Sequence, residues 1–355
     1  MNQRLLTALL LGLIGLSLVG CRTAYIKRSA EVPGKIAPEE VPGAITAAEE
    51  ALLGDRPKVA LDWMRVAGEI EGLPSDQRAK IQRLLEISAD RFITEVESNE
   101  QAAEVLAEIL ELELPRQIAV TGALRGAQLF HERGDDWDAS KTIQSIDKRY
   151  PTHHLRPEAG RLLVECGLAL SQLPSGWFSS NRENAFSTLE YCSIHYPSTE
   201  RGDEVLMRLA EMYEEDKRWT LSILRHEELT TSYPESPLVP YSLARTPHLK
   251  LASIESPEYD RKAILESRRD LERWLNDYAG HPATEQVEYD LADALVRLTV
   301  NDLGVARFYV RIDNDYGARR HAERALAQAR QAGDASLTAD AEAILSGLPP
   351  GEALP

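Results

Sequence analysis

The sequence predicts an all-α protein built as a stack of antiparallel helix pairs. Beyond residue 43 the chain is rich in Ala, Leu, Glu and Arg, which favour helices. No segment sustains the apolar–polar alternation that a half-buried strand requires. Breaks containing Gly, Asp or Pro come every ten to twenty residues, a common length for a helix in a globular protein. These three observations indicate helices joined by short turns.

The first 20 residues have the composition of an export signal. Arg4 is their only charged residue, and an apolar stretch over 5–16 follows it. This stretch is shorter than the ~20 residues that a membrane-spanning helix needs. It ends in Leu-Val-Gly-Cys, which resembles the lipobox of bacterial lipoproteins. We therefore expect residues 1–20 to be removed and Cys21 to carry acyl chains; the alternative is an ordinary secretory signal that happens to contain a cysteine.

Residues 21–43 are predicted to be a flexible linker between the lipid and the body. They contain three prolines and two glycines and show little apolar periodicity. Several acyl chains would hold the protein stably, whereas one chain alone binds a membrane only marginally. Arg22 follows the cysteine, where some lipoproteins retained at the inner membrane carry Asp. The lipobox resemblance therefore implies a lipid-anchored protein on the periplasmic side of the outer membrane.

The charge balance argues against a nucleic-acid partner. The chain has 40 Lys and Arg against 57 Asp and Glu, a net charge of −17 at pH 7. Loss of the export signal would remove one more positive charge. Nucleic-acid binding depends on positive side chains that displace counterions from phosphates. The same balance argues against a body that lies flat on anionic lipid.

Apolar residues recur at helical spacing through the body of the chain. Three such stripes are Ile81, Leu85, Phe92 and Val96; Val205, Leu209, Met212 and Tyr213; and Leu291, Leu295 and Leu298. One helix pair cannot bury its apolar stripe alone, so neighbouring pairs must stack. The stripes and the breaks between them predict eight hairpins, near residues 44–71, 75–97, 98–132, 136–173, 182–216, 217–252, 261–299 and 301–345.

A tyrosine followed by proline recurs along the chain. Three copies are Tyr150-Pro151, Tyr196-Pro197 and Tyr233-Pro234. A fourth, with three residues between tyrosine and proline, is Tyr278-Ala279-Gly280-His281-Pro282, and a possible fifth, without the proline, is Tyr316-Gly317. The tyrosines lie 46, 37, 45 and 38 residues apart. Proline cannot continue a helix, so each copy is expected to end the second helix of a pair. Tetratricopeptide arrays have a period of 34 residues, and longer loops lengthen it. We therefore expect a tetratricopeptide-like, right-handed solenoid of antiparallel helix hairpins.

The hairpins fall into two groups along the chain. Residues 44–132 are expected to form N-terminal helical hairpins, and residues 133–345 to form the repeats that carry Tyr-Pro. Residues 346–355, with two prolines and a glycine, are predicted to be a loose tail.

Four large aromatic residues could belong either to the core or to a binding surface. Trp137 and Trp219 each follow a predicted turn at the start of a helix, where a core position is favoured. Trp177 and Phe178 lie in a predicted loop over 174–182. They could pack back on the stack, which we favour, or contact a partner.

Cys166 and Cys192 are the two cysteines left beyond the lipidation site. If residues 157–173 and 182–195 form a hairpin, the thiols come to similar heights, and a disulfide could form in an oxidising compartment. The favoured alternative is a pair of small buried apolar residues. The cysteines have no metal-ligand spacing, so no metal site is predicted.

The sequence has no pattern typical of a catalytic or cofactor site. It has no glycine-rich phosphate loop, no His-Glu-x-x-His and no nucleophile elbow around a serine. His153-His154 follow a Tyr-Pro turn, so we expect a solvated turn there. We predict no enzyme activity, no cofactor and no metal. Four arginines near the C-terminus, Arg307, Arg311, Arg319 and Arg320, could form a partner-docking surface, because arginine is enriched at binding hot spots. Routine salt bridging to nearby carboxylates is the alternative.

Two segments resemble the BamD family, the tetratricopeptide lipoproteins of the outer-membrane β-barrel assembly machinery. One reads LMRLAEMY at 206–213 and YPESPLV at 233–239. The other reads SRRDL at 267–271, then Tyr278 with a following His-Pro, and ARFY at 306–309. The likeness covers roughly the last two thirds of the mature chain. Residues 44–130 are extra helical material, and residues 241–256 lack the family's Tyr-rich pattern.

The resemblance implies a non-catalytic scaffold that docks onto the outer-membrane barrel-assembly protein through its C-terminal repeats. Unfolded barrel substrates would be received by the earlier repeats. Two alternatives stay open: a repeat lipoprotein that serves another envelope machine, such as a secretin pilot or a division or cell-wall adaptor, and an envelope enzyme with an unrecognised site.

Overall fold

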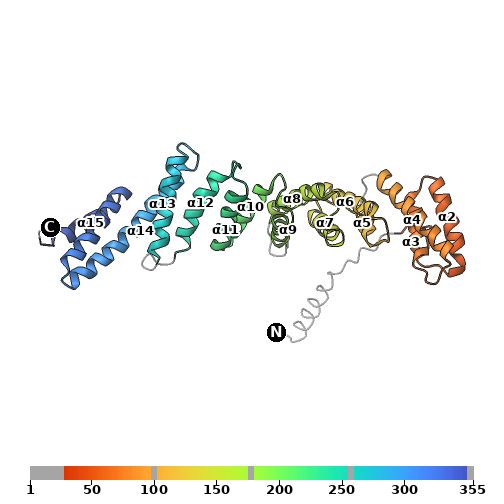
Figure 1. Ribbon diagram of the computed structural model, residues 1–355, viewed down its shortest axis with the longest axis horizontal. Coiled ribbons are helices and arrows are strands. Elements are labelled where there is room, and N and C mark those ends of the chain that lie inside the picture. Colours follow the sequence, from red (N-terminus) through yellow and green to blue (C-terminus); the bar gives the residue numbers. More distant parts are fainter. Residues whose placement is uncertain (1–27, 97–101, 175–179, 255–259, 350–355) are drawn as a thin grey trace, which may run out of the picture. The chain divides into compact units, whose positions relative to one another are not determined.

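The computed structural model describes residues 28–96, 102–174, 180–254 and 260–349 (Figure 1). Over these residues the chain is helical and has no strand, which confirms the predicted all-α class of consecutive antiparallel hairpins. The export signal, Cys21, Trp177, Phe178 and the end of the predicted tail lie outside the described residues.

The helices follow one another with short connections. Their bounds are α2 Val41–Leu53, α3 Pro57–Gly68, α4 Ser75–Glu95, α5 Ala102–Glu108, α6 Arg116–Glu132, α7 Asp136–Arg149, α8 Arg156–Gln172, α9 Asn181–His195, α10 Gly202–Glu215, α11 Trp219–Ser232, α12 Val239–Ala252, α13 Arg261–Asp277, α14 Thr284–Arg311, α15 Asp315–Ala332 and α16 Ala335–Ser346. Two short 3-10 helices are η1 Pro38–Glu40 and η2 Ile109–Glu111.

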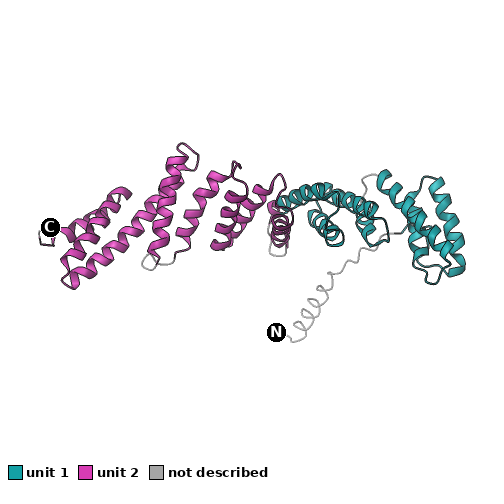
Figure 2. Cartoon of the chain, in the orientation of Figure 1, with its two compact units in different colours: residues 1–170 teal, residues 171–355 magenta. Residues whose placement is uncertain are grey.

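The chain divides into two compact units, residues 1–170 and 171–355 (Figure 2). The division falls in the last turn of α8. It differs from the predicted boundary at 132/133, which was drawn from the repeat pattern and stays a prediction. No helix in the described residues is long and apolar enough to cross a membrane.

The tightest turns share one backbone conformation. The turns after α2, α6, α10, α14 and α15 each contain one left-handed residue: Asp55, Gly134, Lys217, Asp313 and Gly333. The residue after it donates its backbone N–H to the carbonyl five residues back, at 2.8 to 3.0 Å. This is the Schellman closure of a helix, which satisfies carbonyls that the helix end leaves open. Each such turn pairs two consecutive helices.

The tyrosine turns form a second repeated structure. Tyr150, Tyr196, Tyr233 and Tyr278 follow the last residues of α7, α9, α11 and α13, which confirms that these copies close helices. Each tyrosine carbonyl accepts the N–H of the residue three positions on, at 3.0 to 3.1 Å. The fifth copy was wrong, because Tyr316 lies in the first turn of α15. No proline follows it, and the Asn314 side chain caps the helix by accepting the Gly317 N–H at 2.9 Å.

One tyrosine turn also joins one pair of helices to the next. The Tyr233 hydroxyl donates to the carbonyl of Pro197 in the preceding tyrosine turn. A Cβ on Gly202, at the start of α10, would overlap that hydroxyl. Glycine is therefore needed at this position for the two turns to stack.

Some predicted hairpin boundaries were wrong. Residues 75–97 hold one helix, α4, because no breaker interrupts 75–95. The predicted break near residue 300 lies inside α14, which has 28 residues in all. The helix is not interrupted there because 299–301 contain neither Gly nor Pro. From residue 136 on, the predicted hairpins group the helices differently from the tight turns. For example, α7 was predicted to pair with α8, whereas the tight turn at Gly134 joins it to α6. In the pairs α6/α7 and α10/α11, the Tyr-Pro turn ends the second helix, as predicted.

The segment before α2 is attached to the first unit, so its described part is not the flexible linker that the sequence predicted. The backbone N–H and the hydroxyl of Ser29 both donate to Asp62 Oδ2, at 2.9 Å each. Asp62 is buried on α3, and Lys58 Nζ lies 2.5 Å from the same oxygen. Val32 is buried as well. These contacts hold the chain from residue 28 on against α3.

His226 on α11 is buried in the second unit. The ring is 1% exposed, and its Nδ1 lies 3.1 Å from Ser242 Oγ. Burial lowers the pKa of His226 to about 4; Glu214 raises that pKa and Arg245 lowers it, both to a smaller extent. The folded protein therefore holds the neutral imidazole well below the pH at which an exposed histidine takes up a proton.

This burial predicts a loss of stability in mild acid. The contribution of neutral His226 is complete above pH 6.5 and is lost as the pH falls from there toward 4. Between pH 7 and pH 5 the free energy of unfolding should fall by about 2 kcal/mol from this residue. Urea unfolding at the two pH values measures the drop. In His226→Gln the fall in the free energy of unfolding between the two pH values should be smaller by about 2 kcal/mol. An equal fall in both proteins would contradict the lowered pKa of His226.

Candidate protein-binding surfaces

Helix α14 is much longer than α13, the helix that precedes it and packs against it. It has 28 residues, whereas α13 has 17. At 1.5 Å per residue the difference is roughly 16 Å of helix. The C-terminal part of α14 packs on α15 and α16 through Leu303 and the buried alanines of those helices. The outer face of this last part has no helix to cover it among the described residues.

Large apolar side chains lie exposed at this end. Phe308 is 49%, Val310 43%, Ile312 51% and Tyr316 61% exposed. We call these four residues, on the last turn of α14 and the start of α15, the C-terminal apolar surface. Phe308 and Ile312 lie four residues apart, about one turn of a helix, so these two side chains share one side, where a partner could cover them.

The four predicted docking arginines lie around this surface in two different states. Arg307 forms an exposed ion pair with Asp340 at 2.8 Å, and Arg319 donates to the Pro349 carbonyl. Arg311 and Arg320 are exposed and, in the part of the chain that the structure describes, make no ion pair. Salt bridging therefore accounts for Arg307, while Arg311 and Arg320 present their charge to solvent. Their role in docking stays a prediction.

A buried carboxylate fixes the base of this surface. Asp302 on α14 is fully buried and receives charged donors from two other helices. Its oxygens lie 2.9 Å from Arg261 Nη2 on α13, 2.7 Å from His321 Nδ1 and 3.0 Å from Arg324 Nη2 on α15. The His321 ring stacks on Tyr309 at 5.6 Å between centroids. The exposed end of α14 is therefore held in a fixed position against α13 and α15.

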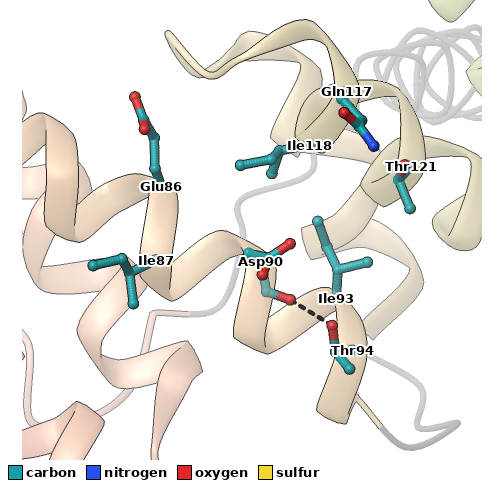
Figure 3. Close-up of a pocket in the computed structure, with 8 residues that line it drawn as sticks. All are labelled: Glu86, Ile87, Asp90, Ile93, Thr94, Gln117, Ile118 and Thr121. Carbon is teal, nitrogen blue, oxygen red and sulfur yellow. Dashed lines mark hydrogen bonds between the residues drawn. The ribbon is translucent and has the colours of Figure 1, made fainter.

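The first unit has a groove between α4 and α6 (Figure 3). It encloses about 500 Å³. Its lining side chains are Glu86, Ile87, Asp90, Ile93, Thr94, Gln117, Ile118 and Thr121. Isoleucines supply apolar contact, and two carboxylates supply negative charge. The groove could hold an apolar side chain of a peptide that also carries a basic residue.

Sequence reasoning missed this groove. It assigned Ile81, Leu85, Phe92 and Val96 to one buried stripe; the first three are buried on α4, whereas Val96 follows the helix and is partly exposed. The opposite face of the same helix carries a second spacing, with Glu86, Asp90 and Ile93 at i, i+4 and i+7. That spacing could have identified a second face, but not the packing of α6 that turns it into a groove.

Cys166 and Cys192 are both buried and are not bonded to each other, so the disulfide that the sequence left possible does not form in this structure. The alternative of small buried residues holds. Burial raises the pKa of Cys192 to about 12, which keeps that thiol protonated at neutral pH. The two cysteines belong to different compact units.

The histidine pair and two tryptophans also have assigned places. His153 is buried, which corrects the expectation of a solvated turn, and its Nε2 lies 3.2 Å from the Asp147 carboxylate. Burial is the main cause that lowers the pKa of His153. His154 is exposed. Trp137 and Trp219 lie at the starts of α7 and α11, as predicted, and both are half-buried.

Comparison with known proteins gives likeness to solved structures alone. No family model matches the chain, and no curated protein matches it. A structure of Pseudomonas aeruginosa PilF is 16% identical, covering 71% of this chain and 98% of that one, with a TM-score of 0.29. A tetratricopeptide repeat protein from Parabacteroides merdae is 11% identical, covering 86% and 99%, with a TM-score of 0.25.

The TPR2AB domain of yeast Sti1, solved with a pHSP90 peptide, is 10% identical, with coverage of 73% and 99% and a TM-score of 0.25. Likenesses at this level give this chain no function. Its fold class rests on its own helices and turns.

Proposed function

We propose that this chain is a non-catalytic, lipid-anchored scaffold that binds a partner protein through the C-terminal apolar surface. The observation that carries the proposal is the combination of exposed Phe308, Ile312 and Tyr316 with the exposed charges of Arg311 and Arg320. The buried ionic contacts of Asp302 fix this end before any partner arrives. A surface that is already ordered loses little conformational entropy on binding.

The partner that fits this surface has an apolar patch with acidic residues at its rim. Apolar contact would cover the aromatic and aliphatic side chains, and carboxylates would pair with Arg311 and Arg320. Exposed Asp313 and Asp315 lie in the same turn, so a partner must place its acids on the arginine side. By the resemblance to the BamD family, the partner is the periplasmic part of the outer-membrane barrel-assembly protein.

Copurification tests the identity of the partner. The full chain, tagged and extracted from membranes in mild detergent, should retain the barrel-assembly protein in stoichiometric amount. The double variant Phe308→Ser/Ile312→Ser should lose it, and Leu224→Ser, at an exposed leucine of α11, should keep it. Stoichiometric capture of a different envelope protein, lost in the same double variant, would reject barrel assembly and keep the scaffold. Capture unaffected by the double variant would reject the surface.

The lipid anchor predicts where the protein is found in the cell. Cys21→Ala removes the acylated thiol, so the body should move from the membrane fraction to the soluble fraction while its helical circular dichroism stays the same. Fractionation followed by immunoblotting measures the shift. Equal membrane retention of the variant in cells that lack the partner would contradict lipidation at Cys21.

A further inference from the structure

Three metal-ligating side chains from three helices converge in the first unit. His131 lies near the end of α6, Asp136 begins α7 and Cys166 lies in α8. Their ligand atoms all lie within 4.8 Å of one another. Gly134, with φ +86°, reverses the chain between the first two residues, so five positions of sequence bring the imidazole and the carboxylate face to face.

Two of the donors face the same nitrogen of the histidine ring. His131 Nδ1 lies 2.5 Å from Asp136 Oδ1 and 3.8 Å from Cys166 Sγ. The other nitrogen, Nε2, lies 3.7 Å from a Glu165 carboxylate oxygen. A catalytic relay needs its nucleophile and its carboxylate on opposite ring nitrogens. Here the Glu165 oxygen on the opposite nitrogen lies beyond hydrogen-bond distance at 3.7 Å, and Cys166 is fully buried, so the side chains do not form such a relay.

The shared nitrogen is arranged as a ligand would be. In the tautomer that carries its proton on Nε2, Nδ1 is an acceptor, and it then faces a carboxylate oxygen and a sulfur that can also donate lone pairs to a cation. A cation among the three satisfies all of them. Histidine ligands to zinc usually donate their second N–H to a carboxylate or a carbonyl, and the Glu165 oxygen, 3.7 Å from Nε2, would have to move closer to accept it.

The distances suit zinc after a small adjustment. Zinc binds sulfur at about 2.3 Å and imidazole nitrogen at 2.0–2.1 Å, so tetrahedral ligands of these kinds lie roughly 3.6 Å apart. The observed separation of Nδ1 and Sγ is 3.8 Å. The Asp136 oxygen must draw back from Nδ1 by less than about 1 Å and approach Sγ, since the three ligand atoms lie within 4.8 Å of one another and zinc needs roughly 3.6 Å between them. Asp136 and Cys166 are buried, and His131 reaches the surface with 31% of its side chain exposed.

We propose that His131, Asp136 and Cys166 bind one Zn²⁺, with a water molecule in the fourth position on the exposed side of His131. Binding releases the thiol proton of Cys166 and any proton on Nδ1 to solvent, and the sulfur and nitrogen lone pairs then bond the metal. The ion ties α6, α7 and α8 together, so its role is to stabilise the first unit.

Zinc binding by the metal-depleted full chain tests the proposal. A Cys21→Ser background removes the N-terminal thiol as a competing ligand. Equilibrium dialysis should then find one zinc per chain, and Co²⁺ in its place should give a thiolate-to-cobalt charge-transfer band. Cys166→Ala and His131→Ala should each lose both signals. Cys192→Ala, which removes a buried thiol of the other unit, should keep both.

The dependence of the melting temperature on zinc is a second readout. A side chain with only a structural role would not make the melting temperature depend on zinc. Saturating zinc should raise the melting temperature of the parent protein and of Cys192→Ala, but not that of Cys166→Ala. If Cys166→Ala fails to fold by circular dichroism, Cys166→Ser and His131→Gln take its place. Zinc binding no greater in the parent protein than in these variants would overturn the proposal and leave His131 and Asp136 as an ordinary ion pair.

Discussion

Replacing Asp302 with alanine is expected to destabilise the second unit by roughly 2–4 kcal/mol. Removal of one partner from a fully buried ion pair costs about 3–5 kcal/mol, because the other charge is left uncompensated. Asp302 is fully buried, but Arg261 and Arg324 are 30% and 41% exposed, so both can recover some hydration. The loss should therefore fall somewhat below the fully buried case. Urea unfolding followed by circular dichroism measures it as a lower midpoint at constant slope.

An exposed ion pair between α14 and α16 provides the control. Arg307 and Asp340 are both about half exposed, at 57% and 49%. Asp340→Ala should change the free energy of unfolding by less than about 1 kcal/mol. Asp302→Asn keeps the shape of the side chain and removes its charge, and it should lie between the two. Equal small effects of Asp302→Ala and Asp340→Ala would show that the buried carboxylate does not hold α13, α14 and α15 together.

Ile312→Asp is expected to weaken partner binding by at least about 30-fold. A central hot-spot residue contributes about 2 kcal/mol or more to binding, which corresponds to that factor. Ile312 is half exposed beside Arg311, so the substitution removes apolar contact area and also places a carboxylate where an acidic partner is expected. Calorimetry or surface plasmon resonance with the purified partner measures the change.

The control for this variant uses the other candidate surface. Ile87→Asp puts the same charge on an isoleucine that is 39% exposed, in the groove between α4 and α6. The affinity should stay within about twofold, because partner binding is assigned to the other unit. A 30-fold loss in Ile87→Asp together with no loss in Ile312→Asp would move the binding surface to the groove. Both proteins must keep the helical circular dichroism of the parent.

Local chemistry explains which parts of the fold could be predicted from the sequence. Proline directly after tyrosine ends a helix at three of the turns, and Gly280 and Pro282 follow Tyr278 at the fourth, so these four turns were predicted at the right positions. The left-handed residue of a tight turn is predictable at Gly134. It is not predictable at Lys217 or Asp313, where the turn imposes the conformation on a residue that rarely adopts it.

Contacts between distant residues explain what was missed. The carboxylate of Asp302 meets partners from positions 261, 321 and 324, and nothing in the spacing of these residues reveals that they meet. Cys166 is 35 residues from His131, so a search for metal-ligand spacing passes over the pair. The arginines near residue 310 were found from composition. The exposed Phe308 and Ile312 beside them were not, because only the length of α14 shows that this end is uncovered.

Site-specific photocrosslinking in cells tests the scaffold proposal most directly. A photoreactive amino acid at position 312 or 316 should give one strong crosslinked product whose partner mass spectrometry identifies as the barrel-assembly protein. The same probe at position 224, also exposed, should give none of that product. No crosslink from positions 312 and 316, with the product forming from position 224, would contradict docking through the C-terminal apolar surface.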